Sequence, residues 1–387
     1  MISYGKQNIN NEDILSVVKT LKSDFLTTGP KTLEFENNFR NKVNSKYAAT
    51  CSNGTAAIYL SLLALNIKKG DVVILPVINF IASLNMLENL SAKVFLTDVD
   101  RTTGQMTPQN LLDCIKKNKL KKIKAVITMY NGGDTLNAEN FYKIKKKYKF
   151  FILEDACHAL GAKYYEKNRY YVGSCKYSDI CTFSFHPVKT ITTCEGGMIT
   201  TNNKKIYDKI KIIRNHGMVR RKSSNKNFFW KYKILYPGFN FRLSDVNCAL
   251  GISQLKRLDK FVRIRNKIAK KYRKKLSSLS NYLKVPNNKN SNSAFHLYII
   301  NIDNKKIKVG RDRIIQLLYK FKIMTQVHYI PVNKHPYYKK YSKLKFIGAK
   351  QYFNSCLSLP IYVDLSERQI NFIYKKLFFL INKYKRK

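Results

Sequence analysis

Ser184-Phe185-His186-Pro187-Val188-Lys189-Thr190-Ile191-Thr192-Thr193-Cys194-Glu195-Gly196-Gly197 is the most informative stretch of this chain. Its Lys189 follows Asp155 by 34 positions, and Asp155 closes the strand-like run 150–154. A carboxylate at a strand end, followed by a lysine in a turn with a Gly-Gly pair close behind, suits pyridoxal phosphate. That cofactor needs an amine for its aldehyde and an acid for its ring nitrogen. Because the chain has 57 lysines, the surrounding sequence must support this interpretation.

Strand-like and helical segments alternate before this stretch. The alternation predicts an α/β fold with a largely parallel sheet that helices cover on both faces. Two more strands, at 180–184 and 198–201, follow with short connections. The earlier strand-like segments are 48–52, 72–76, 93–97, 124–129 and 151–154, and the helical segments are 55–65, 81–89, 108–117 and 138–147.

The pattern changes after about residue 245. A basic segment from Ser244 to Leu279 has apolar residues at near-helical spacing and predicts one long helix, with Ser244 and Asp245 as candidate N-caps. We therefore predict a large domain over 1–245 and a small C-terminal α/β domain over 246–387. The segments expected in the small domain after that helix are a polar loop at 287–293, strands at 294–302 and 324–329, and helices at 311–321 and 367–383.

Composition predicts a soluble, cytoplasmic chain with a packed core. Of its 387 residues, 44% are hydrophobic, residues 1–7 lack a signal-peptide core, and the apolar stretch 72–87 is broken by polar residues and Pro76. We therefore expect no membrane span. The eight cysteines are scattered without CxxC spacing, which predicts no metal site and reduced, mostly buried thiols.

The formal net charge of +48 raises the alternative of nucleic-acid binding. The basic residues are spread along the whole chain, and lysines greatly outnumber the 15 arginines. No helix-turn-helix, zinc-finger or RNP signature accompanies them. We expect a generally basic surface and no nucleic-acid partner, with a field that attracts an anionic substrate as the second interpretation.

Several local features are candidates for one site. The turn Asn53-Gly54-Thr55-Ala56-Ala57 joins a strand to a helix, and a helix N-terminus attracts anions such as phosphate. Asp155 ends a strand, where open α/β sheets place their ligands. Ser184, five residues before Lys189, is a candidate for the same phosphate. Each feature alone is also compatible with an ordinary cap, turn or surface residue.

Aromatic and polar residues elsewhere could complete the site. Phe80, shortly after Pro76, is a candidate to stack on a flat ring, although a core position is the simpler alternative. His158 could flank the ring or merely begin a helix. The segment 238–245, Gly-Phe-Asn-Phe-Arg-Leu-Ser-Asp, precedes the long basic helix.

Together these motifs resemble the DegT/DnrJ/EryC1/StrS family of sugar aminotransferases, which have the type I fold of pyridoxal phosphate enzymes. The matches occur in family order over nearly the whole chain. They are Thr27-Thr28-Gly29-Pro30, Ser52 to Ala57, Glu154-Asp155-Ala156-Cys157-His158-Ala159-Leu160-Gly161, Ser184 to Gly197, and Gly238 to Asp245. The resemblance implies a seven-stranded, mixed but mostly parallel sheet in the large domain and a small C-terminal α/β domain.

Within the family, four segments resemble the transaminases of pseudaminic acid biosynthesis, and hence of flagellin glycosylation and cell-surface polysaccharide formation. They are 128–133, 184–189, 326–332 and 356–360. The implied reaction moves an amino group from L-glutamate to the C4 keto group of a UDP-linked 4-keto-6-deoxy-N-acetylhexosamine. The sequence departs from the family at Asp134-Thr135-Leu136-Asn137, where an aromatic and proline-rich turn is expected, and at Cys194, where glycine is frequent.

The resemblance also implies residue roles. Lys189 holds the cofactor covalently and then moves the proton, and Asp155 stabilises the protonated ring nitrogen. Ser184, Thr55 and Ala56 hold the phosphate, which Gly54 lets approach closely. Asn240 would reach the phosphate of the neighbouring subunit, so the implied active unit is a homodimer with shared active sites.

Three alternatives stay open. A sugar dehydratase of the same fold carries histidine at the position of Lys189, so the lysine argues against it. A transaminase for another nucleotide sugar, of the bacillosamine, legionaminic acid or perosamine type, would share all these motifs. A non-catalytic regulator or basic binding protein would leave Lys189, Asp155 and Ser184 unexplained.

Overall fold

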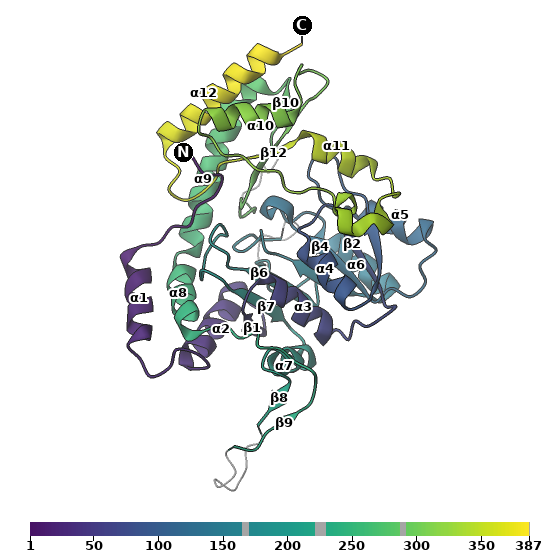
Figure 1. Cartoon of the computed structure of the whole chain (residues 1–387), viewed down its shortest axis with the longest axis vertical. Coiled ribbons are helices and arrows are strands. Elements are labelled where there is room, and N and C mark those ends of the chain that lie inside the picture. The colour runs from purple at the N-terminus through teal and green to yellow at the C-terminus, as the bar shows by residue number, and fades with distance from the viewer. Residues whose placement is uncertain (165–169, 221–229, 287–291, 387) are drawn as a thin grey trace.

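The computed structural model describes residues 1–164, 170–220, 230–286 and 292–386 (Figure 1). Most of the polar loop predicted at 287–293 therefore lies outside the described residues. A seven-stranded sheet occupies the centre, in the order β1-β7-β6-β5-β4-β2-β3. Only β7 runs antiparallel to its neighbours. The α/β fold with a mixed, mostly parallel sheet is thus confirmed. The strands are β1 Tyr47–Cys51, β2 Val72–Pro76, β3 Lys93–Thr97, β4 Ala125–Met129, β5 Phe151–Asp155, β6 Ile180–Ser184 and β7 Gly197–Thr201.

Helices cover both faces of this sheet, because its strands are apolar on both sides. On one face, α3 (Gly54–Ala64), α4 (Ala82–Asn89) and α7 (Lys204–Ile213) pack over residues such as Leu75 and Leu153. The opposite face is covered at the β1–β7–β6 end by α2 (Pro30–Val43) and α8 (Asp245–Lys256), and at the β2–β4 end by α5 (Pro108–Lys117) and α6 (Ala138–Tyr148).

The helix predicted from Ser244 to Leu279 is two helices, so that prediction was wrong in its continuity. Arg257 leaves helical geometry at ψ 1° and separates α8 from α9 (Leu258–Leu276). The guanidinium of Arg257 pairs with the buried Asp13 of α1 (Asn11–Leu21), which ties the break to the N-terminal helix. The tertiary contact outweighs the helical periodicity of the segment.

Asp245 explains two of the sequence motifs in structural terms. Its buried carboxylate accepts hydrogen bonds from the backbone amides of Gly29 at 2.8 Å and Lys31 at 2.7 Å. A carboxylate at a helix start satisfies amides that have no partner within the helix. The motif 27–30 and the motif 238–245 therefore meet at the first turn of α2.

A three-stranded antiparallel sheet lies beyond α9, built from β10 (Leu283–Lys284), β11 (Tyr298–Ile302) and β12 (Cys356–Leu359). It shares an apolar cluster with α9, α10 (Arg311–Lys320) and α12 (Glu367–Tyr384). The remaining helix of this part is α11 (Ile347–Ser355). The division into domains 1–245 and 246–387 stays a prediction.

Two predicted strands differ from the structure. The strand expected at 294–302 begins only at Tyr298, because Phe295 adopts a left-handed φ of 44°. The segment 324–329 is not a strand, and only Gln326 pairs with Ser358 in an isolated bridge. The chain instead leaves the small sheet after Gln326 and brings His328 and Tyr329 to the large sheet's cavity.

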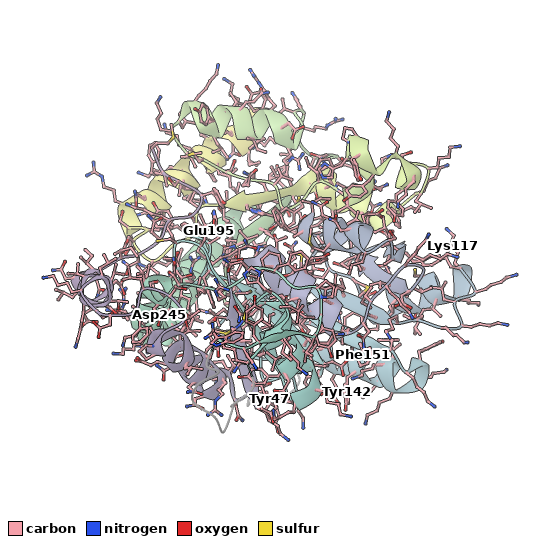
Figure 2. All side chains as sticks on the ribbon, turned by 60° about the horizontal axis from the view of Figure 1, so that its bottom comes forward. Tyr47, Lys117, Tyr142, Phe151, Glu195 and Asp245 are labelled. Carbon is pink, nitrogen blue, oxygen red and sulfur yellow. The ribbon has the colours of Figure 1, made fainter. Side chains whose placement is uncertain are left out.

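The antiparallel pair β8 (Met218–Val219) and β9 (Lys233–Ile234) projects from the molecule next to α7 (Figure 1). Basic side chains extend around the whole outline of the molecule in Figure 2. Within the described residues, no helix combines the length and apolarity that crossing a membrane requires.

Candidate active site

A cavity of about 680 Å³ opens where the parallel strands of the large sheet end. Open α/β sheets bind ligands at this edge. The cavity brings together seven of the predicted site residues: Gly54, Thr55, Phe80, Asp155, His158, Ser184 and Lys189. Two predicted residues do not line it. Ala56 is buried in α3, and Asn240 is exposed next to the projecting hairpin.

The first turn of α3 forms one wall of the cavity. Asn53 caps this helix, since its side chain accepts the Ala56 amide at 2.8 Å. Among the described residues, the amides of Gly54 and Thr55 find no acceptor. A Cβ on Gly54 would lie 2.8 Å from Cβ of Ser184, so only glycine lets that serine pack against the helix start. Two free amides and the Ser184 hydroxyl suit a phosphate group.

The last two residues of β5 carry carboxyl groups that lie in different environments. Because side chains alternate along a strand, Glu154 enters the core and Asp155 enters the cavity. Glu154 accepts hydrogen bonds from Tyr130 at 2.5 Å, Tyr164 at 2.7 Å, Ser178 at 3.0 Å and the Cys181 thiol at 2.7 Å. Burial raises the pKa of Glu154, and these hydrogen bonds lower it.

Asp155 has fewer partners. Its carboxylate accepts the Cys157 amide at 3.2 Å. Burial raises the pKa of Asp155, whereas hydrogen bonds from Cys157 and the charge of Lys189 lower it. A positively charged ring nitrogen beside this carboxylate would lower its pKa further and would itself stay protonated. Asp155 therefore suits the nitrogen of a pyridine ring.

Lys189 lies in the connection between β6 and β7, where its amide donates to the carbonyl of His186 at 2.9 Å. Its side chain is partly buried in the cavity. Desolvation lowers the pKa of Lys189, and the nearby Cys157 and Asp155 raise it. A lysine with a lowered pKa has a larger neutral fraction, and the neutral amine is both nucleophilic and basic.

Histidines are concentrated at this cavity, a signal that our sequence reasoning missed. The chain has six histidines, and five of them line the cavity: His158, His186, His296, His328 and His335. The sequence does not say whether Tyr329, His328 or His335 touches substrate, and it did not single out His296. Rarity of a residue type was the available clue, because these positions share no regular spacing.

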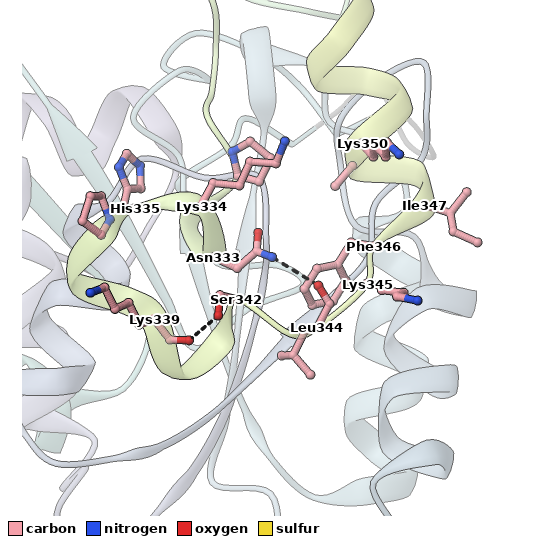
Figure 3. A pocket seen from close by; sticks show the side chains of 13 residues that line it. Asn333, Lys334, His335, Lys339, Ser342, Leu344, Lys345, Phe346, Ile347 and Lys350 are labelled. Carbon is pink, nitrogen blue, oxygen red and sulfur yellow. Dashed lines mark hydrogen bonds between the residues drawn. The ribbon is translucent and has the colours of Figure 1, made fainter.

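His335 also lines a second cavity of about 680 Å³ beside the first. Figure 3 shows that it is formed by the segment leading into α11, with hydrogen bonds from Asn333 to Leu344 and from Ser342 to Lys339. Four lysines line it: Lys334, Lys339, Lys345 and Lys350. Their summed charge gives this side of the site a positive field.

Comparisons with known proteins agree with this geometry. Residues 7–378 match the profile of the DegT/DnrJ/EryC1/StrS aminotransferase family. The chain is 33% identical to a UDP-4-amino-4,6-dideoxy-N-acetyl-beta-L-altrosamine transaminase of Campylobacter jejuni, with 100% of this chain and 99% of that protein covered.

Two solved structures share the fold. The first is Helicobacter pylori PseC, an aminotransferase of pseudaminic acid biosynthesis, with a TM-score of 0.90, 26% identity and coverage of 99% of this chain and 100% of that chain. The second is the PLP form of the sugar aminotransferase Spr1654 of Streptococcus pneumoniae, with a TM-score of 0.88, 26% identity and 99% of each chain covered. These similarities confirm the fold predicted for the large sheet and its helices.

Proposed function

This chain belongs to the DegT/DnrJ/EryC1/StrS aminotransferase family, and we propose that it aminates a nucleotide-linked 4-keto sugar. Its cofactor is pyridoxal phosphate, as in the family members solved with it. The amino donor is L-glutamate, and the acceptor is a UDP-linked 4-keto-6-deoxy-N-acetylhexosamine. The product is UDP-4-amino-4,6-dideoxy-N-acetyl-β-L-altrosamine, the compound for which a relative over the whole chain is named.

One observation carries this proposal: Lys189 and Asp155 share a cavity with the start of α3. The donor set fits the cofactor at three points. The free amides of Gly54 and Thr55, together with Ser184, suit its phosphate. Asp155 suits its ring nitrogen, and Lys189 suits its aldehyde. The exposed ring of Phe80 lies at the same cavity and suits stacking.

Each residue then has a physical task. When bound, pyridoxal phosphate supplies an electron sink for the bonds around the donor's α-carbon. Asp155, as a carboxylate, keeps the ring nitrogen protonated. Lys189, as a neutral amine, would take the proton from the donor's α-carbon and would deliver it to the C4′ carbon of the cofactor. The phosphate role predicted for Ala56 stays a prediction. In the structure its amide donates to the side chain of Asn53.

The positive field beside the cavity supports an anionic acceptor. The second cavity, which the four lysines line, shares His335 with the site. Because a nucleotide diphosphate carries negative charge, this field would raise its local concentration. The field does not distinguish one nucleotide from another.

Another nucleotide 4-keto sugar is the second candidate, since 33% identity leaves room for a changed acceptor. Incubation with glutamate and a panel of UDP-, GDP- and dTDP-4-keto sugars separates the candidates, with product stereochemistry determined by NMR. We expect amination of the UDP-linked sugar at C4. Faster turnover of a GDP- or dTDP-linked sugar would contradict the acceptor that we propose.

We also propose a homodimer with shared active sites. Asn240 is exposed, and the chain segment that precedes it exposes apolar side chains, including Trp230, Tyr236 and Phe239. Helix α1 buries Asp13 and Thr20 and exposes four apolar side chains, those of Ile14, Leu15, Val18 and Leu21. A helix that packs only on its own chain buries its apolar residues and exposes its polar ones.

Subunit mixing tests the shared site. We expect Lys189→Ala and Asn240→Ala proteins to be nearly inactive alone. After the two are unfolded and refolded together, one site per mixed dimer is intact, so about a quarter of wild-type activity should return. Normal activity of Asn240→Ala, or no recovery on mixing, would contradict the proposed shared site.

The decisive test of the function is Lys189→Ala. We expect wild-type protein to carry a visible absorbance band that persists through gel filtration, and the variant to lose both this covalent attachment and turnover. Lys176→Ala, at an exposed lysine before β6, is the matched control and should keep both. Normal turnover by Lys189→Ala would exclude the proposed chemistry, and salt-sensitive nucleic-acid binding without cofactor would favour the regulator instead.

A further inference from the structure

Tyr329 and His158 form a hydrogen-bonded pair inside the cavity, although they are 171 positions apart. The Tyr329 hydroxyl lies 3.0 Å from Nε2 of His158. The two rings are nearly parallel, with centroids 6.0 Å apart, and Phe80 packs against Tyr329 with its ring centroid at 5.8 Å. Both members of the pair line the cavity together with Asp155 and Lys189.

The backbone fixes the direction of this hydrogen bond. The Gly132 amide donates to Nδ1 of His158 at 3.4 Å, so Nδ1 must carry a lone pair. Burial and the charges of Lys189 and His328 lower the pKa of His158, which keeps the imidazole neutral. A neutral imidazole with an unprotonated Nδ1 carries its proton on Nε2. His158 therefore donates to the oxygen of Tyr329.

The Tyr329 hydroxyl is left with a proton to donate. Among the described residues, it has no hydrogen-bond partner other than His158. Burial, with the negative charge of Asp155 as a smaller cause, raises the pKa of Tyr329 and keeps it protonated. The other titratable groups around the pair are Tyr4, His296 and His328. Of these, the buried His296 also lacks a partner for its Nδ1.

We propose that Tyr329, oriented by His158, donates a hydrogen bond to an electron-rich oxygen of the molecules that occupy this cavity. The inference rests on the proposed function, which supplies two such oxygens. One is the phenolic oxygen of the cofactor, and the other is the C4 carbonyl oxygen of the acceptor sugar. In either case Tyr329 contacts the reacting molecules, and His158 is a positioning residue that acts through it.

Tyr329→Phe separates the two oxygens. If the partner is the cofactor, the pH midpoint of the visible absorbance band of the holoenzyme rises by about one unit, because the donor stabilises the deprotonated phenolic oxygen. If the partner is the sugar, this midpoint stays unchanged. Single-turnover amination of the sugar then slows by about 10- to 100-fold, while the half-reaction with glutamate keeps its rate. An unchanged midpoint together with unchanged half-reactions would overturn the proposal.

Further variants test the positioning role. Tyr374→Phe, which removes a hydroxyl that bonds Ser278 on the surface, is the matched control and should behave as wild type. His158→Gln retains an N–H donor and should preserve most of the wild-type behaviour. His158→Phe should reproduce the Tyr329→Phe effect, and the double variant should be little worse than either single change. Fully additive losses would contradict a pair that acts as a unit.

A direct measurement of the tautomer needs no turnover. In ¹⁵N NMR spectra of histidine-labelled holoenzyme, the His158 signals, assigned by their loss in His158→Gln, should show a protonated Nε2 and an unprotonated Nδ1. A protonated Nδ1 would overturn the proposal, since Tyr329 would then donate to His158. If the wild-type protein itself bound no cofactor or showed no turnover, the result would instead count against the proposed function. The two failures are therefore distinguishable.

Discussion

Glu154 and Asp155 are neighbours on β5, yet they occupy opposite environments. Glu154 receives four side-chain hydrogen bonds in the core, whereas Asp155 receives the Cys157 amide and faces Lys189 across a cavity. Both carboxyls have a pKa raised by burial. The comparison shows that neither burial nor the type of group distinguishes a structural carboxyl from one that is available to a ligand. The number of hydrogen-bond partners distinguishes them, because a carboxyl whose hydrogen bonds are all satisfied has none left for a ligand.

The largest expected effect comes from Asp155→Asn. The amide has the same shape but no charge for a ring nitrogen, so kcat/KM should fall by about 10²- to 10³-fold. The free energy of unfolding should change by less than about 1 kcal/mol, since the asparagine oxygen can still accept the Cys157 amide. Steady-state kinetics and urea denaturation measure the two quantities. Unchanged turnover would show that Asp155 is not the ring's partner.

Glu154→Ala should give the opposite pattern. Removing the acceptor leaves four buried donors unsatisfied, so the free energy of unfolding should fall by about 4 kcal/mol. The folded fraction should keep kcat within about threefold, because Glu154 does not face the cavity. Urea denaturation and active-site titration check both. A loss of kcat without a loss of stability would remove the distinction between the two carboxyls.

A smaller, pH-dependent effect is expected for Glu154→Gln. Because burial raises the folded-state pKa of Glu154, the protonated form favours the fold. The stability that wild type holds over the variant is therefore fully present below the unfolded pKa of about 4.5 and is lost as pH rises through the folded value. The loss is about 1.4 kcal/mol for each unit of elevation. If the difference in free energy of unfolding between wild type and Glu154→Gln instead increased as pH rises, Glu154 would be ionised in the folded protein.

Local patterns predicted most of the large sheet, because its strands are short, apolar and bounded by turns. The strands at 93–97 and 180–184 have the predicted bounds, and α5 spans 108–117 as predicted. The part of the site that follows strand ends and helix starts, around Gly54, Asp155 and Ser184, was predictable for the same reason. Parallel strands carry their ends to one edge.

The remainder depends on contacts between distant segments. The break at Arg257 follows from its pairing with Asp13. The segment 324–329 has the sequence of a strand, but after Gln326 it leaves the small sheet and lines the cavity. Helix α1 was not predicted, and its two buried residues, Asp13 and Thr20, are polar. The His158–Tyr329 pair joins segments 171 positions apart, and no local pattern links them.

The anchoring of Glu154 has a consequence for protein engineering. Its hydrogen bonds reach Tyr130, Tyr164 and Ser178, so the backbone that carries Asp155 is held from three other parts of the chain. A laboratory search for new acceptor specificity should leave this strand untouched. Diversity belongs at Ile330 on the rim of the cavity, which is 46% exposed and can be exchanged with little loss of stability.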